Sequence, residues 1–439
     1  MNIVMLSLIY ILGGICRGAV LYNISTVIIE MYQKMAQVPY DHVPDLVSII
    51  SVSATIGSII SSIVSTQMVR KFGARTILIF TTAISLISCC LVLPSIHWIY
   101  LFVFKFISGF SSCFTISLIP MVCAQYISVA QRPIVGSLYS VSLVLSMVVC
   151  NVIQFFISSE KQLYWVIQVL SIVSSAFLLI LSLRTPKEKH EVLKSENVYS
   201  KKYTKCFLVA FIIGISIAGT GYNPILQFST LIFKNSFNSP KSGTIGAIIT
   251  SSINLISAMI SIPVVRRFKR KVLLIVGSIL MLLSYTVTIL ALKLVEDSKL
   301  QNNIVLGATI SFIFFYSCSS GSLFFVLIGE VFPKQLKMFF MNFVMVIHFV
   351  GTMVTTFIFP IIDEFINYIL YIGFCSINLI LIVKFLPETK GKSFDEIERE
   401  MITESRKVVQ KEDVEKGESV ETTRDIVVSA ETEQGTEIK

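Results

Sequence analysis

Charged residues are scarce in this sequence. Only 14% of its 439 residues are Asp, Glu, Lys or Arg, against about 25% in an average soluble domain. A soluble chain of this length needs more charge to cover its surface, so the composition excludes a soluble enzyme, a nucleic-acid-binding protein and a secreted disulfide scaffold. The formal net charge of +9 could suggest nucleic acid, but the basic residues are distributed over loops between apolar segments.

Motifs of catalysis and metal binding are also absent. The sequence has no P-loop, GxSxG or HExxH motif and no paired-carboxylate constellation, so it predicts neither an enzyme nor a self-contained ATP-driven pump. Its nine cysteines form no CxxC pair, and nearly all lie inside apolar segments. This is typical of small buried residues rather than of metal ligands or disulfides. We expect no catalytic residue, no metal and no cofactor.

Apolar residues, by contrast, make up 54% of the chain. A spanning helix needs about 20 predominantly apolar residues, and turn residues and charges divide the chain accordingly. The chain enters its first apolar segment at Ile3 with no basic leader, so we expect a retained helix rather than a signal peptide. Twelve spans are predicted, at 3–29, 46–69, 76–95, 98–124, 136–158, 163–183, 207–233, 243–265, 272–294, 303–328, 339–360 and 367–386.

Lysine and arginine are unevenly divided between the loops. With the N-terminus in the cytoplasm, the cytoplasmic loops hold 18 of them and the opposite loops and span ends hold 6. Because cytoplasmic loops carry the basic excess in membrane proteins, both termini are predicted to be cytoplasmic.

The segment after Leu386 is acidic, with 15 Asp and Glu against 9 Lys and Arg. It predicts disorder from about residue 403 onward. Before that point, Ser393 and Glu396 have capping-box spacing, and Phe394, Ile397 and Met401 fall on one helical face. A short cytoplasmic helix is expected there.

Two stretches repeat along the chain. Residues 68–75 resemble residues 264–271, and Gln125 precedes Arg132 by seven residues as Glu330 precedes Lys337. Similar loops after equivalent spans indicate two six-helix halves, as in secondary transporters whose substrate site lies between the halves. We expect an N-terminal half at 1–183, a short cytoplasmic linker at 184–206, a C-terminal half at 207–386 and a cytoplasmic tail at 387–439.

Several motifs resemble those of a known family. They are PETKG at 387–391 followed by FDEI at 394–397, Tyr22-Asn23, GYN at 221–223, and EVFP at 330–333 with Lys337. These are similar to signatures of the sugar porter family of the major facilitator superfamily, over about residues 13–401. The resemblance implies an all-α membrane protein with twelve transmembrane helices in two halves, and a hexose as the first expected substrate.

The sequence also departs from this family. Carried over by position, the seventh-helix Gln pair falls on Ile217 and Ala218, the fifth-helix Gln on Ser140, and the tenth-helix Trp on Phe325. These departures leave the identity of the sugar open.

Uncharged amides and hydroxyls recur at helical spacing in three spans. Each sugar hydroxyl removed from water without a partner costs about 1–3 kcal/mol, so a sugar site needs such groups. They are Thr220, Asn223 and Gln227 on span seven, Ser251, Asn254 and Ser261 on span eight, and Ser140, Asn151 and Gln154 on span five. The alternative is hydrogen bonding between helices. The resemblance favours binding for Asn223 and Asn254, and it places Phe325 and His348 at the same cavity.

The resemblance also implies a cytoplasmic gate of charged residues that pair between the halves. It falls on Arg75, Arg132, Arg267, Glu330, Lys337 and Glu388. The N-terminal half has lost its acids, because Arg70 and Gln125 stand at their positions. Fewer pairs should favour an inward-open state. Gly219, Gly221 and Pro224 weaken span seven near Asn223, which indicates either a mobile gate or close helix packing.

The expected function is therefore a facilitative sugar uniporter of the plasma membrane, working by alternating access within the lipid bilayer. A proton-coupled symporter stays open as an alternative, although Asn23 replaces the first-helix carboxylate and leaves His348 as the proton-carrier candidate. Arg17, inside span one, keeps a carrier of organic or phosphorylated anions open. The acidic tail is compatible with a nutrient sensor. The oligomeric state is not indicated.

Overall fold

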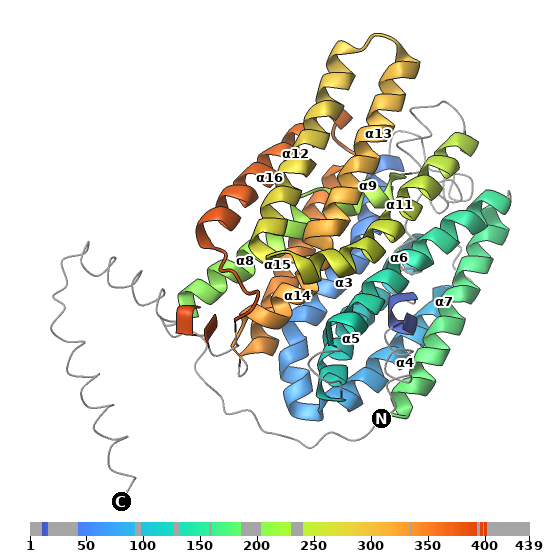
Figure 1. Cartoon of the computed structure of the whole chain (residues 1–439). Helices are drawn as coiled ribbons and strands as arrows, with labels where there is room; N and C mark the ends of the chain where they lie inside the picture. The colour runs from blue at the N-terminus through green and yellow to red at the C-terminus, as the bar shows by residue number, and fades with distance from the viewer. Residues whose placement is uncertain are drawn as a thin grey trace, which may run out of the picture.

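The computed structural model describes residues 11–15, 43–92, 98–126, 132–157, 160–185, 203–229, 240–333, 336–392, 396–397 and 399–401. Within these ranges every regular element is helical (Figure 1). Nine helices of this part of the chain are long and apolar enough to cross a membrane, with mean hydropathies from 1.4 to 2.4. The composition thus produces the predicted bundle of spanning helices.

The helices follow the predicted spans closely. The N-terminal group comprises α3 (Val43–Phe72), α4 (Ala74–Val92), α5 (Trp98–Tyr126), α6 (Arg132–Phe156) and α7 (Glu160–Leu183). The C-terminal group comprises α8 (Thr204–Ala218), α9 (Tyr222–Gln227), α11 (Pro240–Arg267), α12 (Arg270–Leu294), α13 (Ser298–Tyr316), the π-helix η3 (Ser317–Gly321), α14 (Ser322–Val331), α15 (Lys337–Ile358) and α16 (Glu364–Phe385). Of the first predicted span, only 11–15 is described.

Two spans differ from the prediction of continuous α-helices. Span seven is interrupted between α8 and α9, where Gly221 adopts a left-handed φ of 74° that glycine alone tolerates without strain. Span ten contains the π-helix η3 between α13 and α14. Such π-helical turns often lie at functional sites.

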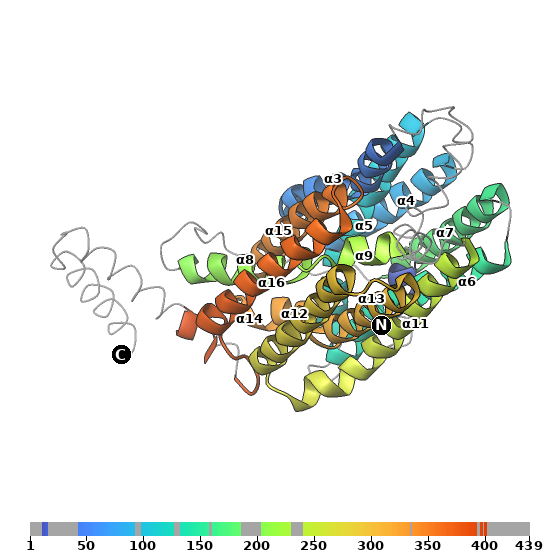
Figure 2. The same ribbon diagram turned by 90° about the horizontal axis from the view of Figure 1, so that it is seen from above.

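Helices pack mainly within each group, and two seams join the groups. In the N-terminal group α5 packs on α3 and α4, and in the C-terminal group α12 packs on α13 and α16. Across the groups, α3 packs on α15, and α6 packs on α11 (Figures 1 and 2). These two contacts, called here the α3/α15 seam and the α6/α11 seam, connect the halves.

Small residues let the helices approach closely. A Cβ on Gly109 of α5 would lie 1.9 Å from the carbonyl oxygen of Ala54 in α3, and the Ser58 hydroxyl donates to the Gly109 carbonyl at 3.0 Å. Many other buried hydroxyls bond one turn back in their own helix, as Thr82 does to Leu78 at 2.8 Å. Glycine and serine therefore serve packing between spans.

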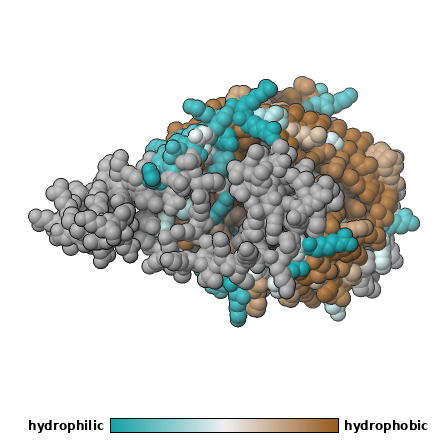
Figure 3. All heavy atoms as spheres, turned by 60° about the horizontal axis from the view of Figure 1, so that its bottom comes forward, coloured by the Kyte–Doolittle hydropathy of each residue, from teal (hydrophilic) through white to brown (hydrophobic). Residues whose placement is uncertain are grey.

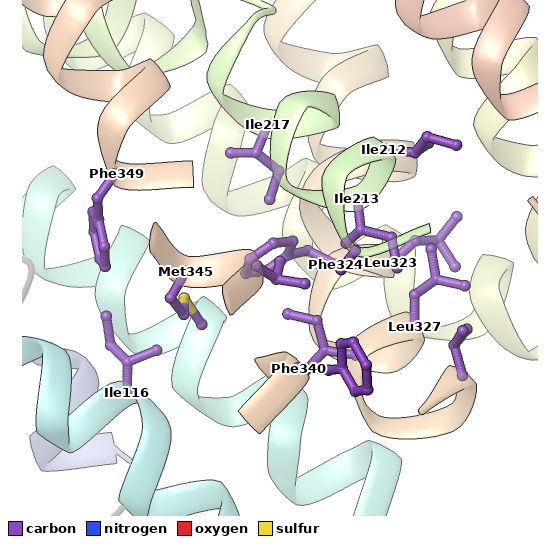
Figure 4. Packing of buried hydrophobic residues seen from close by; sticks show 14 of the residues in the cluster. Ile116, Ile212, Ile213, Ile217, Leu323, Phe324, Leu327, Phe340, Met345 and Phe349 are labelled. Carbon is purple, nitrogen blue, oxygen red and sulfur yellow. The ribbon is translucent and has the colours of Figure 1, made fainter. Parts of the chain in front are cut away.

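The outer faces of the helices are apolar and the interior is continuous. Leu283 of α12 and Ile377 of α16 are more than half exposed, as suits contact with lipid, and Figure 3 shows the broad hydrophobic surface. Inside, one apolar cluster includes residues of both halves. In Figure 4, Ile116 of α5 lies near Met345 and Phe349 of α15.

The segment after α16 packs onto the bundle. Ile397 and Met401 are buried in the apolar cluster, and Lys392 forms an ion pair with Glu400. This agrees with the predicted apolar face, although Ser393, Phe394 and everything after 401 lie outside the described residues.

Candidate functional site

The break in span seven is held by two tyrosines. The Tyr285 hydroxyl of α12 donates to the carbonyl of Thr220, and the Tyr371 ring of α16 lies against Gly221. The Thr220 hydroxyl is itself satisfied by the Ile217 carbonyl at 2.8 Å. The predicted single face of Thr220, Asn223 and Gln227 therefore does not form, because Thr220 lies in the interruption and not on α9.

The short helix α9 presents two of the predicted polar residues. The Asn223 amide donates to the Thr352 hydroxyl of α15 at 3.1 Å, and Asn223 is only half-buried. The Gln227 amide nitrogen is shielded from solvent and has no hydrogen-bond partner among the described residues. Both amides are therefore suited to exchange their present surroundings for a polar ligand.

Asn254 of α11 lies at the centre of a polar network. Its amide donates to the Tyr222 hydroxyl at 2.8 Å, and its carbonyl accepts a hydrogen bond from Ser317 in η3. The Tyr222 ring stacks on Tyr316, with ring centroids 3.8 Å apart. The π-helix thus brings a hydroxyl to Asn254, and the network connects spans seven, eight and ten.

The predicted residues of span five lie on α6, where Asn151 faces α11 of the other half. The Asn151 amide of α6 donates to the Ser251 hydroxyl of α11 at 3.0 Å and lies 3.4 Å from the Ala247 carbonyl. Gln154 is half-buried one turn further along. Ser140 lies within α6, but its side chain is outside the described part of the structure. Ser261 is buried and bonds to the Ala258 carbonyl of its own helix.

His348 lies among aromatic rings near the middle of α15. Its ring centroid is 5.7 Å from Phe324 and 5.0 Å from Phe349. Phe325, the predicted stacking residue, belongs to α14, but its side-chain position is not described. The surroundings of His348 are consistent with the apolar part of a cavity wall.

Together, α9, α11, η3 and α15 present amides, hydroxyls and aromatic rings. Such groups can bind an uncharged, hydroxyl-rich ligand, because each hydroxyl finds a neutral donor or acceptor and each C–H face an apolar ring. Among the described residues no group of His, Cys, Asp and Glu could hold a metal ion.

The predicted gate acids bind to residues of the C-terminal half and of the segment that follows it. Glu330 pairs with Arg270 at 3.2 Å and accepts from the Thr389 hydroxyl at 2.7 Å. Glu388 accepts from the backbone N–H groups of Arg270 and Lys271 at 3.0 and 3.1 Å. It therefore caps the N-terminus of α12, where a negative charge is favourable.

The predicted gate bases bond mainly to backbone carbonyls. Arg75 donates to Leu183 at 3.0 Å, and Lys337 donates to Gly329 at 2.6 Å. Arg267 is exposed, and its own carbonyl accepts from Lys390 at 2.6 Å. The side chain of Arg132 lies outside the described residues. The ion pairs of the described residues, Arg270–Glu330 and Lys392–Glu400, both lie in the C-terminal part of the chain; pairing across the halves stays a prediction.

Several partners of these residues were not predicted from the sequence. Tyr222, Ser317 and Thr352 complete the amide network, and Arg270 and Thr389 complete the gate cluster. Tyr222 lies beside Asn223 inside the recognised motif, and Arg270 lies in the repeated basic loop, so both had a signal. Ser317 and Thr352 had none, because their importance arises from spans far apart in sequence.

Known proteins are similar in sequence to this chain over most of its length. The family model "Sugar (and other) transporter" matches residues 6–190 and 183–401. The glucose transporter GlcP of Staphylococcus epidermidis is 21% identical over 90% of this chain and 97% of its own. The facilitated trehalose transporter Tret1 of Bombyx mori is 27% identical, but over 48% of this chain and 43% of its own.

Solved structures show the same fold. The proton:xylose symporter XylE bound to 6-bromo-6-deoxy-D-glucose superposes with a TM-score of 0.77 at 18% identity, covering 90% of this chain and 98% of its own. A D-xylose–proton symporter gives 0.75 at 19% identity and covers 90% and 100%. The fold is thus the two-halved major facilitator fold of the membrane sugar porters, as predicted. Its matching family model, its relatives and this fold together show that the chain belongs to the sugar transporter family.

Proposed function

We propose that this protein is a facilitative hexose carrier in which residues 1–183 and 207–386 rock around a site centred on α9. The observation that carries the proposal is a set of neutral polar side chains. Asn223 of α9 donates to Thr352 of α15, Gln227 lies one turn further along α9, and His348 lies one turn before Thr352 on α15. Neutral amides and hydroxyls match the hydroxyls of a sugar, and an anion would be poorly served by them. The site is reached in turn from each side of the membrane.

The distribution of carboxylates favours a uniporter. Position 23 carries an amide, and the acids of the spans lie at their ends, as Glu330 and Glu364 do. A proton-driven carrier needs a group that titrates during the cycle, and amides do not titrate. The relatives include both facilitated and proton-coupled sugar transporters, so coupling has to be decided by experiment, with His348 as the residue to test.

The basic loops support an orientation with both termini in the cytoplasm, since Arg70, Lys71, Arg266 and Arg267 all lie in the last turns of α3 and α11. We place the carrier in the plasma membrane, where facilitated sugar uptake is useful because a gradient exists.

Uptake of labelled hexoses into proteoliposomes tests the proposal. We expect saturable uptake and exchange without a pH gradient or membrane potential, and no accumulation above the external concentration. Asn378→Leu, which breaks a bond inside the C-terminal half, is the matched control for reconstitution. Accumulation that collapses with a protonophore and is lost in His348→Asn would instead establish proton coupling. Absence of uptake for a full hexose panel would reject the substrate class.

A further inference from the structure

Within the described ranges, each seam between the halves contains a buried hydrogen bond from an asparagine amide to a hydroxyl. On the α6/α11 seam, the Asn151 amide donates to the Ser251 hydroxyl at 3.0 Å. On the α3/α15 seam, the Asn342 amide of α15 donates to the Thr66 hydroxyl of α3 at 2.7 Å. Both asparagines are less than one-tenth exposed. In each case an amide of one half is bound to a hydroxyl of the other.

The two bonds lie towards opposite ends of the bundle. We define the basic end as the end where α3 and α11 finish in Arg70–Lys71 and Arg266–Arg267. Asn342 is five residues from the start of α15 at this end, or about 8 Å at 1.5 Å per residue, and Thr66 is about 9 Å from the end of α3.

The Asn151–Ser251 bond, measured along its helices in the same way, lies far from the basic end. Asn151 is nineteen residues beyond the start of α6 at Arg132, or about 28 Å, and Ser251 is about 24 Å before the end of α11. The Asn151–Ser251 bond therefore belongs to the outer half of the bundle, and the Asn342–Thr66 bond to the half near the basic end.

We propose that Asn151–Ser251 and Asn342–Thr66 are two opposing latches that set the balance between the outward-facing and inward-facing states. Opening the outer side separates α6 from α11 at the outer end and breaks the first bond. Opening the basic end separates α3 from α15 there and breaks the second. Both bonds are made together in this structure, so both seams are closed at these points. Asn151 is accordingly a positioning residue rather than a sugar ligand.

The chemistry suits a reversible latch. While the seam is closed, each buried amide needs its partner, because an unsatisfied donor is costly. When the seam opens, water replaces the hydroxyl, so the net gain from the bond stays small and either state remains accessible. A neutral hydrogen bond of this kind should change the ratio of the two states by about three- to tenfold when it is removed. The inference rests on the proposed alternating access, but not on which sugar is carried.

Hydrogen–deuterium exchange on the full-length protein in lipid nanodiscs, without substrate, tests the latches. Asn151→Leu should raise exchange at the outer ends of α6 and α11 and lower it at the basic ends of α3 and α15. Asn342→Leu should do the reverse. Should either fail to fold, Ser251→Ala and Thr66→Val remove the same bonds from the other side. The matched control is Asn378→Leu, because Asn378 and Ser216 form an equally buried amide–hydroxyl pair inside the C-terminal half.

Opposite shifts in the two latch variants, absent from the control, support the proposal. Shifts in the same direction, or changes no larger than those of Asn378→Leu, would overturn it. Hexose uptake measured in parallel separates this from the proposed function. If the protein takes up a hexose but hydrogen exchange is unchanged in the two latch variants, only the latches are rejected. If hydrogen exchange shifts in opposite directions but no hexose is taken up, only the substrate class is rejected.

Discussion

At the scale of single residues, the two asparagines of the candidate site differ in what holds them. Asn223 is half-buried, and its amide donates to the Thr352 hydroxyl. Asn254 is almost fully buried and bonds to Tyr222 and Ser317 at once. A ligand can displace one weak partner more readily than two, so Asn223 is the better direct contact and Asn254 the better support for Tyr222.

Asn223→Ala should therefore weaken sugar binding by about 1–3 kcal/mol, the cost of leaving a buried ligand hydroxyl unpaired. The measurement is KM and kcat for uptake, with a higher KM expected at unchanged reconstitution. Thr352→Val removes the other member of the pair but keeps the Asn223 amide, so its effect should be smaller. Uptake kinetics equal to wild type in Asn223→Ala would contradict the assignment.

The Asn254 network predicts coupled effects of mutation. Tyr222→Phe keeps the ring that stacks on Tyr316 but removes the hydroxyl that accepts from the Asn254 amide at 2.8 Å, while Asn254→Ala removes the donor of the same bond. The effects of mutating neighbours in one network on the free energy of unfolding are not additive. The loss of stability in the double variant should therefore be smaller than the sum of the losses in the two single variants, by about 0.5–3 kcal/mol. Thermal unfolding in detergent of the wild type, the two single variants and the double variant gives the stabilities that this double-mutant cycle compares. Strict additivity would show that the bond contributes nothing.

The sequence identified these asparagines but not their partners. Helical spacing and the family motif place Asn223 and Asn254 on inward faces, which depends on local sequence alone. Ser317 and Thr352 belong to spans ten and eleven, and their pairing with spans seven and eight depends on how the helices pack. The same reason explains why the partner of Asn151 could not be predicted: Ser251 belongs to the other half.

At the scale of elements, the informative departures are the two interrupted helices. The glycines of span seven predicted weakness, but the position of the break is decided by the left-handed Gly221 and by the tyrosines packed around it. The π-helix of span ten had no recognised signal, since Ser317–Gly321 contains no proline. Local propensity therefore predicted where a helix is weak, but tertiary contacts determine how it departs from α-helical geometry.

Gly221→Ala tests the break directly. A left-handed backbone costs an L-residue about 1–2 kcal/mol, and the new Cβ would lie 2.5 Å from the Tyr371 ring. We expect a lower unfolding temperature and reduced uptake. Gly373→Ala in α16 is the matched control, because nothing lies within 4 Å of its Cβ position, and alanine favours the helix by about 1 kcal/mol. Equal stability of the two variants would refute the role of Gly221.

At the scale of the whole molecule, hydropathy predicted most of the helical architecture. Membrane helices must satisfy their backbone internally, so long apolar segments had one structural solution. The ion pairs at the basic end were not predictable in the same way. Glu330 and Glu388 face bases and N–H groups of the C-terminal part of the chain, because α12 packs on α16 and the segment after α16 reaches the start of α12.

This arrangement leaves the basic end with few acids that could pair across the halves when that end closes. The C-terminal acids are engaged inside their half, while Arg266, Arg267 and Lys269 are exposed. Position 125 is next to the last residue of α5, at the basic end, and carries Gln where the family has Glu. A carboxylate there should attract the basic loops of the other half and favour the state closed at this end.

Gln125→Glu is therefore expected to lower hydrogen exchange at the basic ends of α3 and α15 and to raise it at the outer ends of α6 and α11. An exposed pair contributes up to about 1 kcal/mol, which is about a fivefold change in the population ratio. Gln125→Met is the uncharged control. The shift should vanish at 1 M salt, where the screening length falls to about 3 Å. A shift that persists at high salt, or that appears equally in Gln125→Met, would show that packing at position 125 and not charge controls the basic end.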